Sequence, residues 1–331
     1  MALPRILLVG TGGTITMTPG AAGIVPTLSG EDLVRAVPEL GRHANLEVVS
    51  FSAKPGASLT LEDLIAIADL VDRRLGDGCV GAVVVQGTDT IEESAYVLDL
   101  LVASDRPIVV TGAMRGAAMP GADGPANLLA AVIVAGSEAA AGLGALVVLN
   151  DEVHAARSVR KMHTASPAAF ASPGAGPLGA VVEGALVRTR RIERTAVLPR
   201  PASVAEWPVA LAAIALGDDG RLLRALPSLG YRGVVLEAMG AGHMPAALVP
   251  DIESLAAAVP VVLATRVPAG RVFTRTYAFA GSETDLAARG VVGAGDLAPA
   301  KAVQLLRLLL AQPVLGAPIT DQFARYAKAR A

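Results

Sequence analysis

The sequence has few of the residues that would indicate a disulfide scaffold, a metal centre or a nucleic-acid surface. Its single cysteine, Cys79, cannot form an internal disulfide, and we interpret it as a small buried residue. Its four histidines include no pair spaced four residues apart around a glutamate, so a metal site is unsupported. The formal net charge is −2 and there is no dense patch of lysine and arginine, which argues against a nucleic-acid partner.

Charged residues are also scarce, at 18% of the chain, whereas hydrophobic residues make up 53%. A membrane span must therefore be considered, and the most apolar region is Ala126–Leu149. Ser137, Glu138 and two glycines interrupt this region, so it fits a helix, a turn and a buried strand better than one span of about 20 residues. No basic segment followed by an apolar stretch opens the chain. We expect a cytoplasmic protein with no membrane partner.

What the sequence has instead is short apolar runs that alternate with helical patterns. At 331 residues it is long enough for two domains. Runs that are apolar on both faces, separated by helices, indicate a parallel sheet covered by helices. The expected strands are Ile6–Val9, Leu46–Phe51, Gly81–Val85, Pro107–Thr111 and Ala145–Leu149, and the expected helices are Gly30–Val37, Leu61–Leu75, Ile91–Ala103 and Ala126–Ala135.

The pattern changes in the second half of the chain. Gly176–Arg190 has two short runs about a Glu-Gly turn, which indicates a hairpin, and Arg194–Pro208 has the proline-rich composition of a linker. The β-α rhythm then resumes, with strands at Val209–Leu216, Gly233–Leu236 and Val261–Ala264 and a last helix around Leu297–Leu310. We predict a larger N-terminal α/β domain with a parallel sheet at 1–193, a linker at 194–208, and a smaller flavodoxin-like α/β domain at 209–331.

The stretch Gly10–Met17, GTGGTITM, crowds three glycines beside threonines at the end of the first apolar run. It could be a phosphate-binding turn, a threonine presented for chemistry, or a tight bend after a strand. A dinucleotide-binding loop needs a further glycine and a Walker loop needs Gly-Lys-Ser/Thr, and both patterns are absent. Phosphate binding is therefore excluded, and the other two interpretations stay open.

Two later strand ends also carry small and polar residues. Gly87–Thr90, GTDT, follows a buried strand, and a glycine-rich loop follows Thr111–Ala113. Thr90 with Glu93 matches a capping box, and Asp123 is expected to cap the next helix, so helix capping could explain these residues. Ligands, however, bind at the carboxyl edge of open α/β sheets. From the residues alone, the structural and the functional interpretation are equally supported.

Taken together, these stretches resemble the L-asparaginase family of bacterial amidohydrolases. The resemblance covers essentially the whole chain, and it implies a two-domain α/β hydrolase that needs no cofactor and no metal. It also favours a threonine presented for chemistry in the first motif. The motifs that carry it, in the family's order and spacing, are TGGTI at Thr11–Ile15, GTDTIEESAYVLDL at Gly87–Leu100, GAMR and ADGPANL within Gly112–Leu128, and LVVLNDEV and RSVRKMHT within Leu146–Thr164.

The resemblance assigns roles to individual residues. Thr14 falls on the family's nucleophile, Thr88 on its second threonine, Asp89 on the motif's aspartate, and Lys161 on the lysine that pairs with Thr88. A threonine hydroxyl is a poor nucleophile until a base removes its proton, and lysine is a base only when neutral. We therefore expect Lys161 to be desolvated, with a lowered pKa, although the residues alone would favour a solvated surface charge. Backbone N–H groups near Thr88 and Ala113 would stabilise the oxyanion.

Two side chains of the family pattern are missing. The loop after TGGTI has no tyrosine, and Ile24 stands at the matching place. Gly56 stands where the family has a serine that binds the substrate's carboxylate, with Ala57 and Ser58 next to it. The predicted substrate contacts in this domain are these three residues with Gly87 and Ala113. Because the serine is lost, we expect L-asparagine to be a weak substrate.

The second domain contributes two further candidates. Related enzymes place an acid there that reaches a neighbouring subunit's site, and here Tyr277 and Glu283 lie in that region. Tyr277 as a packed aromatic residue is an equally supported interpretation. The resemblance implies a homo-oligomer, a dimer or a tetramer, that hydrolyses the side-chain amide of L-asparagine to L-aspartate and ammonia. The alternatives are an amidase for D-asparagine, glutamine or another ω-amide, and a catalytically silent ligand-binding homologue.

Overall fold

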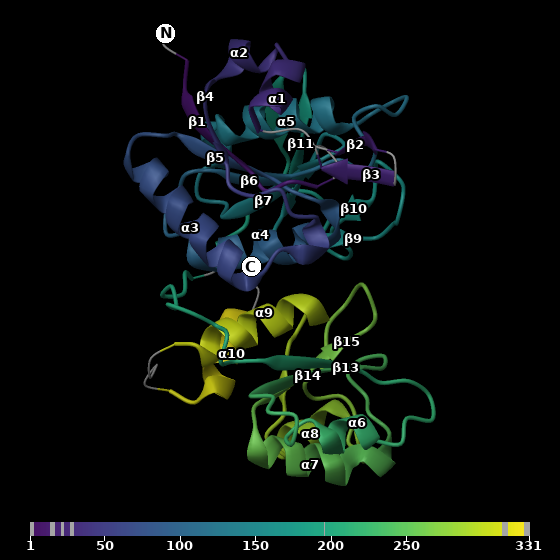
Figure 1. Ribbon diagram of the computed structural model, residues 1–331. Helices are drawn as coiled ribbons and strands as arrows, with labels where there is room; N and C mark the ends of the chain where they lie inside the picture. The colour runs from purple at the N-terminus through teal and green to yellow at the C-terminus, as the bar shows by residue number, and fades with distance from the viewer. Residues whose placement is uncertain are drawn as a thin grey trace. The chain divides into compact units, whose positions relative to one another are not determined.

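The chain divides at residue 197 into two units, each with its own sheet. The computed structural model describes residues 3–13, 17–20, 23–26, 30–194, 196–312 and 317–327. The first unit ends at Val197 and the second begins at Leu198, a boundary that falls inside the predicted linker. Helices pack on both faces of each sheet (Figure 1). The two-domain α/β fold expected from the sequence is confirmed.

Within the described residues, the large unit is built on an eight-stranded sheet in the order β12-β11-β8-β7-β6-β5-β1-β4. From β4 to β7 in that order the strands pair in parallel, as predicted, and beyond β7 they pair antiparallel. Strands β11 and β12 form the predicted hairpin. The strands are β1 Arg5–Gly10, β4 Asn45–Ser50, β5 Gly81–Val85, β6 Ile108–Thr111, β7 Ala145–Leu149, β8 Glu152–Ala155, β11 Gly179–Val182 and β12 Ala185–Arg188.

The helices of the large unit cover both faces of this sheet. Helices α1, α2 and α5 pack on one face, and α3 and α4 pack on the other (Figure 1). The core between α5 and the sheet includes Leu128 of the helix and Ile6 and Val83 of the strands, all buried. The helices are α1 Gly30–Ala36, α2 Leu40–His43, α3 Leu61–Gly76, α4 Ile91–Leu101 and α5 Gly124–Ala135, with 3-10 turns η2 Gly56–Ser58, η3 Thr88–Thr90 and η4 Glu138–Ala140.

The most apolar region of the sequence folds as predicted. Residues 126–149 run through α5, the turn η4 and the fully buried strand β7. In the part of the chain that the structure describes, no helix has both the length and the apolar character that a membrane crossing requires. Cys79 is fully buried, as predicted.

Two small antiparallel pairs lie outside the main sheet of the large unit. Strand β2 (Met17–Gly20) pairs with β3 (Gly23–Pro26) just after the first glycine motif. Strand β9 (Arg160–Lys161) pairs with β10 (Phe170–Ala171), with Lys161 opposite Phe170. The second pair carries one of the predicted catalytic residues, although it is only two residues long on each side.

The small unit has a four-stranded parallel sheet in the order β13-β14-β15-β16 among its described residues. The prediction that the chain's last helix lies near Leu297–Leu310 is wrong, because α10 follows α9. Helix α10 is short, and it buries Phe323 and Tyr326 on one face. The elements are β13 Val209–Ala213, β14 Gly233–Ala238, β15 Val261–Thr265, β16 Val292–Gly293, α6 Arg221–Ala225, η5 Ala246–Leu248, α7 Val249–Ala258, α8 Glu283–Ala288, α9 Pro299–Leu310 and α10 Ile319–Ala327.

Candidate active site

Three glycines from separate loops meet at the carboxyl edge of β1 and β5. Gly13 has a φ of +93°, and a Cβ atom built on it would lie 2.1 Å from the backbone nitrogen of Gly87. A Cβ on Gly56 would lie 2.6 Å from the carbonyl oxygen of Gly87. Only glycine lets the three backbones approach so closely. The first motif is therefore packed against the GTDT turn, and Thr14, the next residue after Gly13, lies outside the described residues.

The turn η3, between β5 and α4, brings three of the four predicted catalytic residues together. Lys161 Nζ donates to Thr88 Oγ1 at 2.8 Å and lies 3.1 Å from Asp89 Oδ1. Thr88 is 6% exposed, and the side chains of Lys161 and Asp89 are 20% and 63% exposed. Lys161 is thus a partly buried amine in contact with a buried hydroxyl, and Asp89 presents its carboxylate to solvent beside them.

A glutamate that the sequence analysis did not identify holds the backbone of Lys161. The backbone N–H of Lys161 donates to Glu92 Oε2 at 2.8 Å. Glu92 lies in the first turn of α4, where sequence alone gives it the role of an acidic residue that stabilises the helix N-terminus. Its neighbour Glu93 offered the same pattern, so the sequence contained no signal that would single out Glu92.

Thr90 ties the GTDT turn to η2 instead of capping α4. Its hydroxyl donates to the carbonyl oxygen of Gly56 at 2.9 Å, and it makes no side-chain capping bond. Gln86, fully buried, adds a bond from Nε2 to the carbonyl of Gly87 at 3.2 Å. Helix capping, one of the two interpretations of this turn, is therefore not supported, because the Thr90 side chain forms no capping box with Glu93. The chain enters α4 through a 3-10 turn, and the hydroxyl of Thr90 satisfies the backbone of the neighbouring loop.

The loop after β6 is held by carboxylate and amide side chains. Asp123 precedes α5 as predicted, but its carboxylate makes no capping bond and instead accepts from the backbone N–H groups of Met114 and Arg115 at 2.9 and 2.8 Å. The expected side-chain cap is therefore wrong, since two converging loop amides occupy that carboxylate. Asn127 Nδ2 donates to the carbonyl of Gly112 at 3.0 Å. These bonds fix the backbone around Ala113, which is 1% exposed.

The predicted substrate-binding residues of η2 differ in where they lie. Gly56 is buried against Gly87 and offers no side chain, whereas Ala57 and Ser58 are exposed. The structure therefore brings Gly56 to the GTDT turn without a hydroxyl group. Ile24 lies in β3, and its side chain is outside the described part of the molecule.

Tyr277 and Glu283 belong to the small unit, where the side chain of Glu283 contacts the backbone of Tyr277. Glu283 is 3% exposed, and its Oε1 accepts from the N–H groups of Thr276 and Tyr277, both at 2.9 Å. Burial favours a higher pKa, but these amides and nearby His243 outweigh it and hold the pKa of Glu283 below its usual value. Tyr277 is 40% exposed, and its ring packs edge-on against His243. Within its own unit, Glu283 fixes the loop that presents Tyr277.

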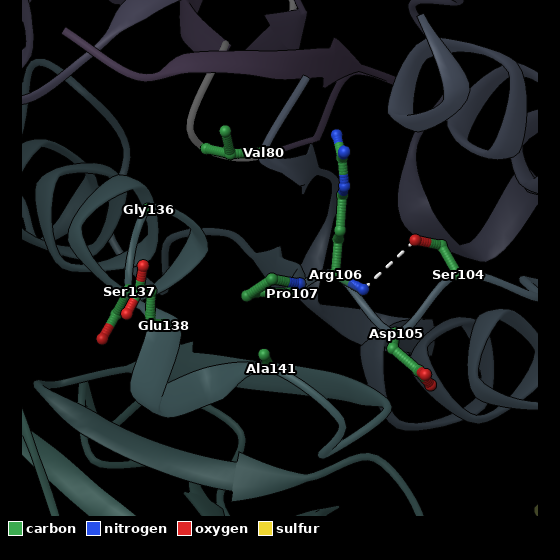
Figure 2. Close-up of a pocket in the computed structure, with 9 residues that line it drawn as sticks. All are labelled: Val80, Ser104, Asp105, Arg106, Pro107, Gly136, Ser137, Glu138 and Ala141. Atoms are coloured by element: carbon green, nitrogen blue, oxygen red, sulfur yellow. Dashed lines mark hydrogen bonds between the residues drawn. The ribbon is translucent and has the colours of Figure 1, made fainter. Parts of the chain in front are cut away.

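A cavity of about 420 Å³ lies at the other end of the large sheet, where β5 and β6 begin (Figure 2). None of the predicted site residues lines it. Its lining is Val80, Ser104, Asp105, Arg106, Pro107, Gly136, Ser137, Glu138 and Ala141. Among the residues that the structure describes, no group of histidine, cysteine and acidic side chains could hold a metal ion.

The fold and the lysine–threonine contact at the strand ends fit an amidohydrolase of the two-domain α/β class, and comparison with known families and proteins identifies it. The family model "Asparaginase, N-terminal" matches residues 5–193, and "Glutaminase/Asparaginase C-terminal domain" matches residues 208–323. The chain therefore belongs to the asparaginase family and is an asparaginase-type amidohydrolase, an enzyme class that acts on linear amides.

Named relatives match it over almost their whole length. An L-asparaginase from Bacillus licheniformis is 34% identical over 96% of this chain and 98% of its own, and L-asparaginase 2 from Escherichia coli is 33% identical over 98% and 94%. The crystal structure of a probable cytoplasmic L-asparaginase from Campylobacter jejuni has a TM-score of 0.85 and 31% identity, covering 98% of this chain and all of that one. The expected family is thus confirmed.

Proposed function

We propose that this enzyme hydrolyses the side-chain amide of L-asparagine to L-aspartate and ammonia, with Thr14 as the nucleophile. The observation that carries the proposal is the 2.8 Å contact between Lys161 Nζ and Thr88 Oγ1 with Asp89 beside it. Side chains 73 residues apart meet here at a strand end packed against the loop that leads to Thr14. That arrangement supports a proton relay for a threonine hydroxyl, which needs a base before it can act as a nucleophile.

The proposed reaction proceeds through an ester on Thr14. Its Oγ1 attacks the amide carbon and gives up its proton, and backbone N–H groups near Thr88 and Ala113 stabilise the oxyanion. The C–N bond then breaks, and the nitrogen takes a proton and leaves as ammonia. Water hydrolyses the ester, which forms the carboxylate and restores the hydroxyl. Thr88, Lys161 and Asp89 move the protons, and the exposed carboxylate of Asp89 also binds the substrate's ammonium group.

The substrate proposal takes account of the missing hydroxyl at Gly56. A hydrogen bond to a charged group contributes about 1.5–3 kcal/mol, so its loss weakens binding of an α-carboxylate roughly ten- to a hundredfold. We expect a KM for L-asparagine in the millimolar range or above, and a smaller penalty for an amide whose carboxylate is masked. A micromolar KM with strong discrimination against that analogue would show that another group binds the carboxylate.

Ammonia release by the purified enzyme tests this function. A panel of L-asparagine, D-asparagine, L-glutamine and simple ω-amides separates the L-asparaginase proposal from the alternative of an amidase for another amide. If no amide releases ammonia while asparagine still binds, the chain is a ligand-binding homologue and the proposal is wrong. Thr88→Val is the matched negative control, because it removes the relay hydroxyl and preserves the shape of the side chain.

We further propose that the enzyme is a homo-oligomer in which the small unit of one subunit closes the site of its neighbour. Tyr277 is the residue available for that contact, since it is 40% exposed together with Phe273 and Phe279 at 40% and 49%. Exposed aromatic clusters of this kind are typical of interaction surfaces. Light scattering at working concentration tests the proposal, and a fully active monomer would contradict it.

Two aspects of organisation complete the proposal. We propose that 1–193 and 209–331 are separate domains joined by 194–208, which limited proteolysis of the linker would test.

We also propose a cytoplasmic location, with support from the description of the Campylobacter jejuni relative, whereas a relative from Haemophilus influenzae is described as a probable periplasmic L-asparaginase. Cell fractionation distinguishes the two compartments.

A further inference from the structure

A buried histidine on β8 lies between two polar side chains. His154 is 1% exposed, its Nδ1 lies 3.1 Å from Ser172 Oγ, and its Nε2 lies 3.3 Å from Glu152 Oε2. Burial lowers the pKa of His154 below its usual value, although the carboxylate of Glu152 acts in the opposite direction. A neutral ring with its proton on Nε2, facing Glu152, leaves Nδ1 free to accept from the hydroxyl of Ser172.

Ser172 connects this histidine to the hairpin that carries Lys161. It follows β10 directly, and β10 pairs with β9, where Phe170 is the partner of Lys161. Just beyond β9, the N–H of Met162 donates to the carbonyl of Ala169 at 2.7 Å, so the two strands are linked at this end also. Ser172 therefore directly follows the strand that pairs with the strand of Lys161.

The bond between His154 and Ser172 links the hairpin to the main sheet through side chains, in addition to the packing of the buried Ala169 and Phe170. Strands β9 and β10 form a separate two-stranded sheet, and β8 belongs to the eight-stranded sheet. After Ser172 the chain turns back to β8, where the N–H of Leu178 donates to the carbonyl of Val153 at 2.7 Å. On its other side the hairpin is held by the bond from Lys161 N–H to Glu92. The hairpin that carries Lys161 is thus tied to the main sheet on one side by the His154–Ser172 bond and to α4 on the other by Glu92.

We propose that His154 and Ser172 are positioning residues that fix where Lys161 Nζ lies relative to Thr88. The proposal rests on the proton-relay role proposed for Lys161. The bond joins the rigid sheet to the hairpin through a buried pair, and loss of either partner leaves the other buried and unsatisfied, which is unfavourable. The hairpin then loses its side-chain tie to β8, and Lys161 loses its fixed distance from the threonine. A misplacement of about 1 Å can lower a rate about a hundredfold.

The test compares two disruptive variants with a conservative one and a control. Ser172→Ala removes the donor and His154→Phe removes the acceptor, whereas His154→Asn places an amide oxygen where it can accept from Ser172. Asp72→Ala is the control, because Asp72 accepts from the N–H groups of Ala103 and Ser104 at the opposite end of the sheet. All variants are assayed well below their unfolding midpoints, so that loss of folded protein does not contribute.

The expected result is a fall in kcat with little change in KM. Ser172→Ala and His154→Phe are expected to lower kcat about ten- to a hundredfold and to change KM less than about threefold. His154→Asn is expected to keep most of the activity, and Asp72→Ala to lower the unfolding midpoint without lowering kcat. If Ser172→Ala and His154→Phe both keep wild-type kcat, with unfolding midpoints shifted only as in the control, the pair is structural and the proposal is wrong.

A second readout does not depend on activity. Hydrogen–deuterium exchange of peptides that cover 160–171 is expected to rise in Ser172→Ala and to stay unchanged in Asp72→Ala, because only the first variant releases the hairpin. Unchanged exchange in Ser172→Ala would show that the bond does not hold the hairpin and would overturn the proposal. Lys161→Met, assayed in parallel, separates the two proposals: full activity of that variant contradicts the relay itself, whereas exchange still reports on the tie.

Discussion

In both units of this enzyme, parallel strands end at a common carboxyl edge of the sheet. The charged residues at these two edges make different kinds of contact. In the large unit, Lys161 contacts the hydroxyl of Thr88 through its side chain, and Asp89 beside it is 63% exposed. In the small unit, Glu283 is buried, and its Oε1 accepts two backbone N–H groups of its own loop. The first arrangement brings an amine, a hydroxyl and a carboxylate into contact through their side chains, and the second satisfies the carboxylate with backbone amides.

The difference shows that the carboxyl edge of a parallel sheet is a favourable place for an active site, but that such an edge alone is not sufficient to form an active site. In the large unit three glycine backbones from separate loops pack against one another, whereas Gly281 in the small unit packs against the backbone of Met244 and not against another glycine. In the small unit the comparable loops pack through aromatic rings, with Tyr277 and Phe279 both against His243. Glycine contacts bring backbone and small polar groups together, whereas aromatic contacts fill the same space with side chains.

The largest effect is expected from removing the hydroxyl groups of the large unit's edge. Thr14→Ala and Thr88→Val should each lower kcat by at least about 10³-fold, since a nucleophile or its relay acts in the transition state. Thr189→Val is a suitable control, because its hydroxyl donates to the carbonyl of Leu178, a residue outside the predicted site. More than a tenth of wild-type turnover in a correctly folded Thr14 or Thr88 variant would contradict the assignment.

A smaller but still large effect is expected from Gly13→Ala. The new methyl group would lie 2.1 Å from the backbone of Gly87, and backbone atoms cannot move aside as a flexible side chain can. We expect kcat to fall about a hundredfold as the two motifs separate, and stability to fall by about 1–3 kcal/mol from overpacking.

Gly142→Ala is the matched control for this prediction. Gly142 also has a positive φ, of +72°, but a Cβ built on it would meet nothing within 4 Å. It therefore carries only the conformational penalty of alanine in this region, about 1–2 kcal/mol, without the clash. Equal losses of stability and activity in the two variants would show that the contact between Gly13 and Gly87 is unimportant.

An intermediate effect is expected from Glu283→Gln in the small unit. The amide oxygen can still accept from Thr276 and Tyr277, but without the negative charge these bonds weaken, so we expect a loss of about 1–2 kcal/mol in stability and a kcat within about threefold of wild type. Chemical denaturation and steady-state kinetics measure the two effects. A large loss of kcat with unchanged stability would place Glu283 in catalysis and remove the contrast between the two edges.

The same residue gives a pH dependence of stability. Because the folded protein holds the pKa of Glu283 below its unfolded value of about 4.3, its stabilising contribution is complete above that value. The contribution is lost as the pH falls through the lower folded pKa. The difference in stability between the wild type and Glu283→Gln should therefore be largest near neutral pH and should shrink in acid. A difference that is constant down to strongly acidic pH would contradict this explanation.

The strands of the large sheet could be predicted because burial on both faces leaves a continuous apolar run. Strands β5 and β7 have the predicted bounds, and the alternation of strands and helices was enough to assign the fold class. The short pair β9 and β10 gave no such signal, since two residues are too few to show any period. Lys161 therefore looked like part of a solvated basic run, and only the family resemblance pointed to its contact with Thr88.

The contacts of the polar residues around the site were harder to predict than the places of these residues next to helices. Thr90 and Asp123 both precede helices, and local sequence predicts a cap for each. In the structure, the Thr90 hydroxyl donates to the carbonyl of Gly56, and the Asp123 carboxylate accepts from two N–H groups of the loop after β6. The Glu92 carboxylate likewise accepts from the backbone N–H of Lys161. Local patterns cannot show such partners, because they depend on which loops the sheet brings together.

The smallest effect is expected from an ion pair that lies at the same edge as the site. Lys54 follows β4, its backbone N–H donates to the carbonyl of Thr11, and its Nζ lies 2.7 Å from a carboxylate oxygen of Asp63. Burial favours a higher pKa for Asp63, but bonds from Lys54 and Thr60 outweigh it and hold the pKa below its usual value. Lys54 thus resembles Lys161 in charge and place, but its partner is a carboxylate and not a buried hydroxyl.

Lys54→Met should therefore leave kcat unchanged and lower stability by only about 0.2–1 kcal/mol, because the lysine side chain is 41% exposed and water screens the pair. The loss should be complete above the unfolded pKa of Asp63, about 3.9, and should disappear as the pH falls through the lower folded pKa, where the ion pair is lost. Thermal unfolding at neutral and acidic pH, with kinetics of Lys54→Met and Lys161→Met side by side, measures both effects. If Lys54→Met lost as much activity as Lys161→Met, the contact with Thr88 would not distinguish Lys161 from Lys54, and the relay role proposed for Lys161 would be wrong.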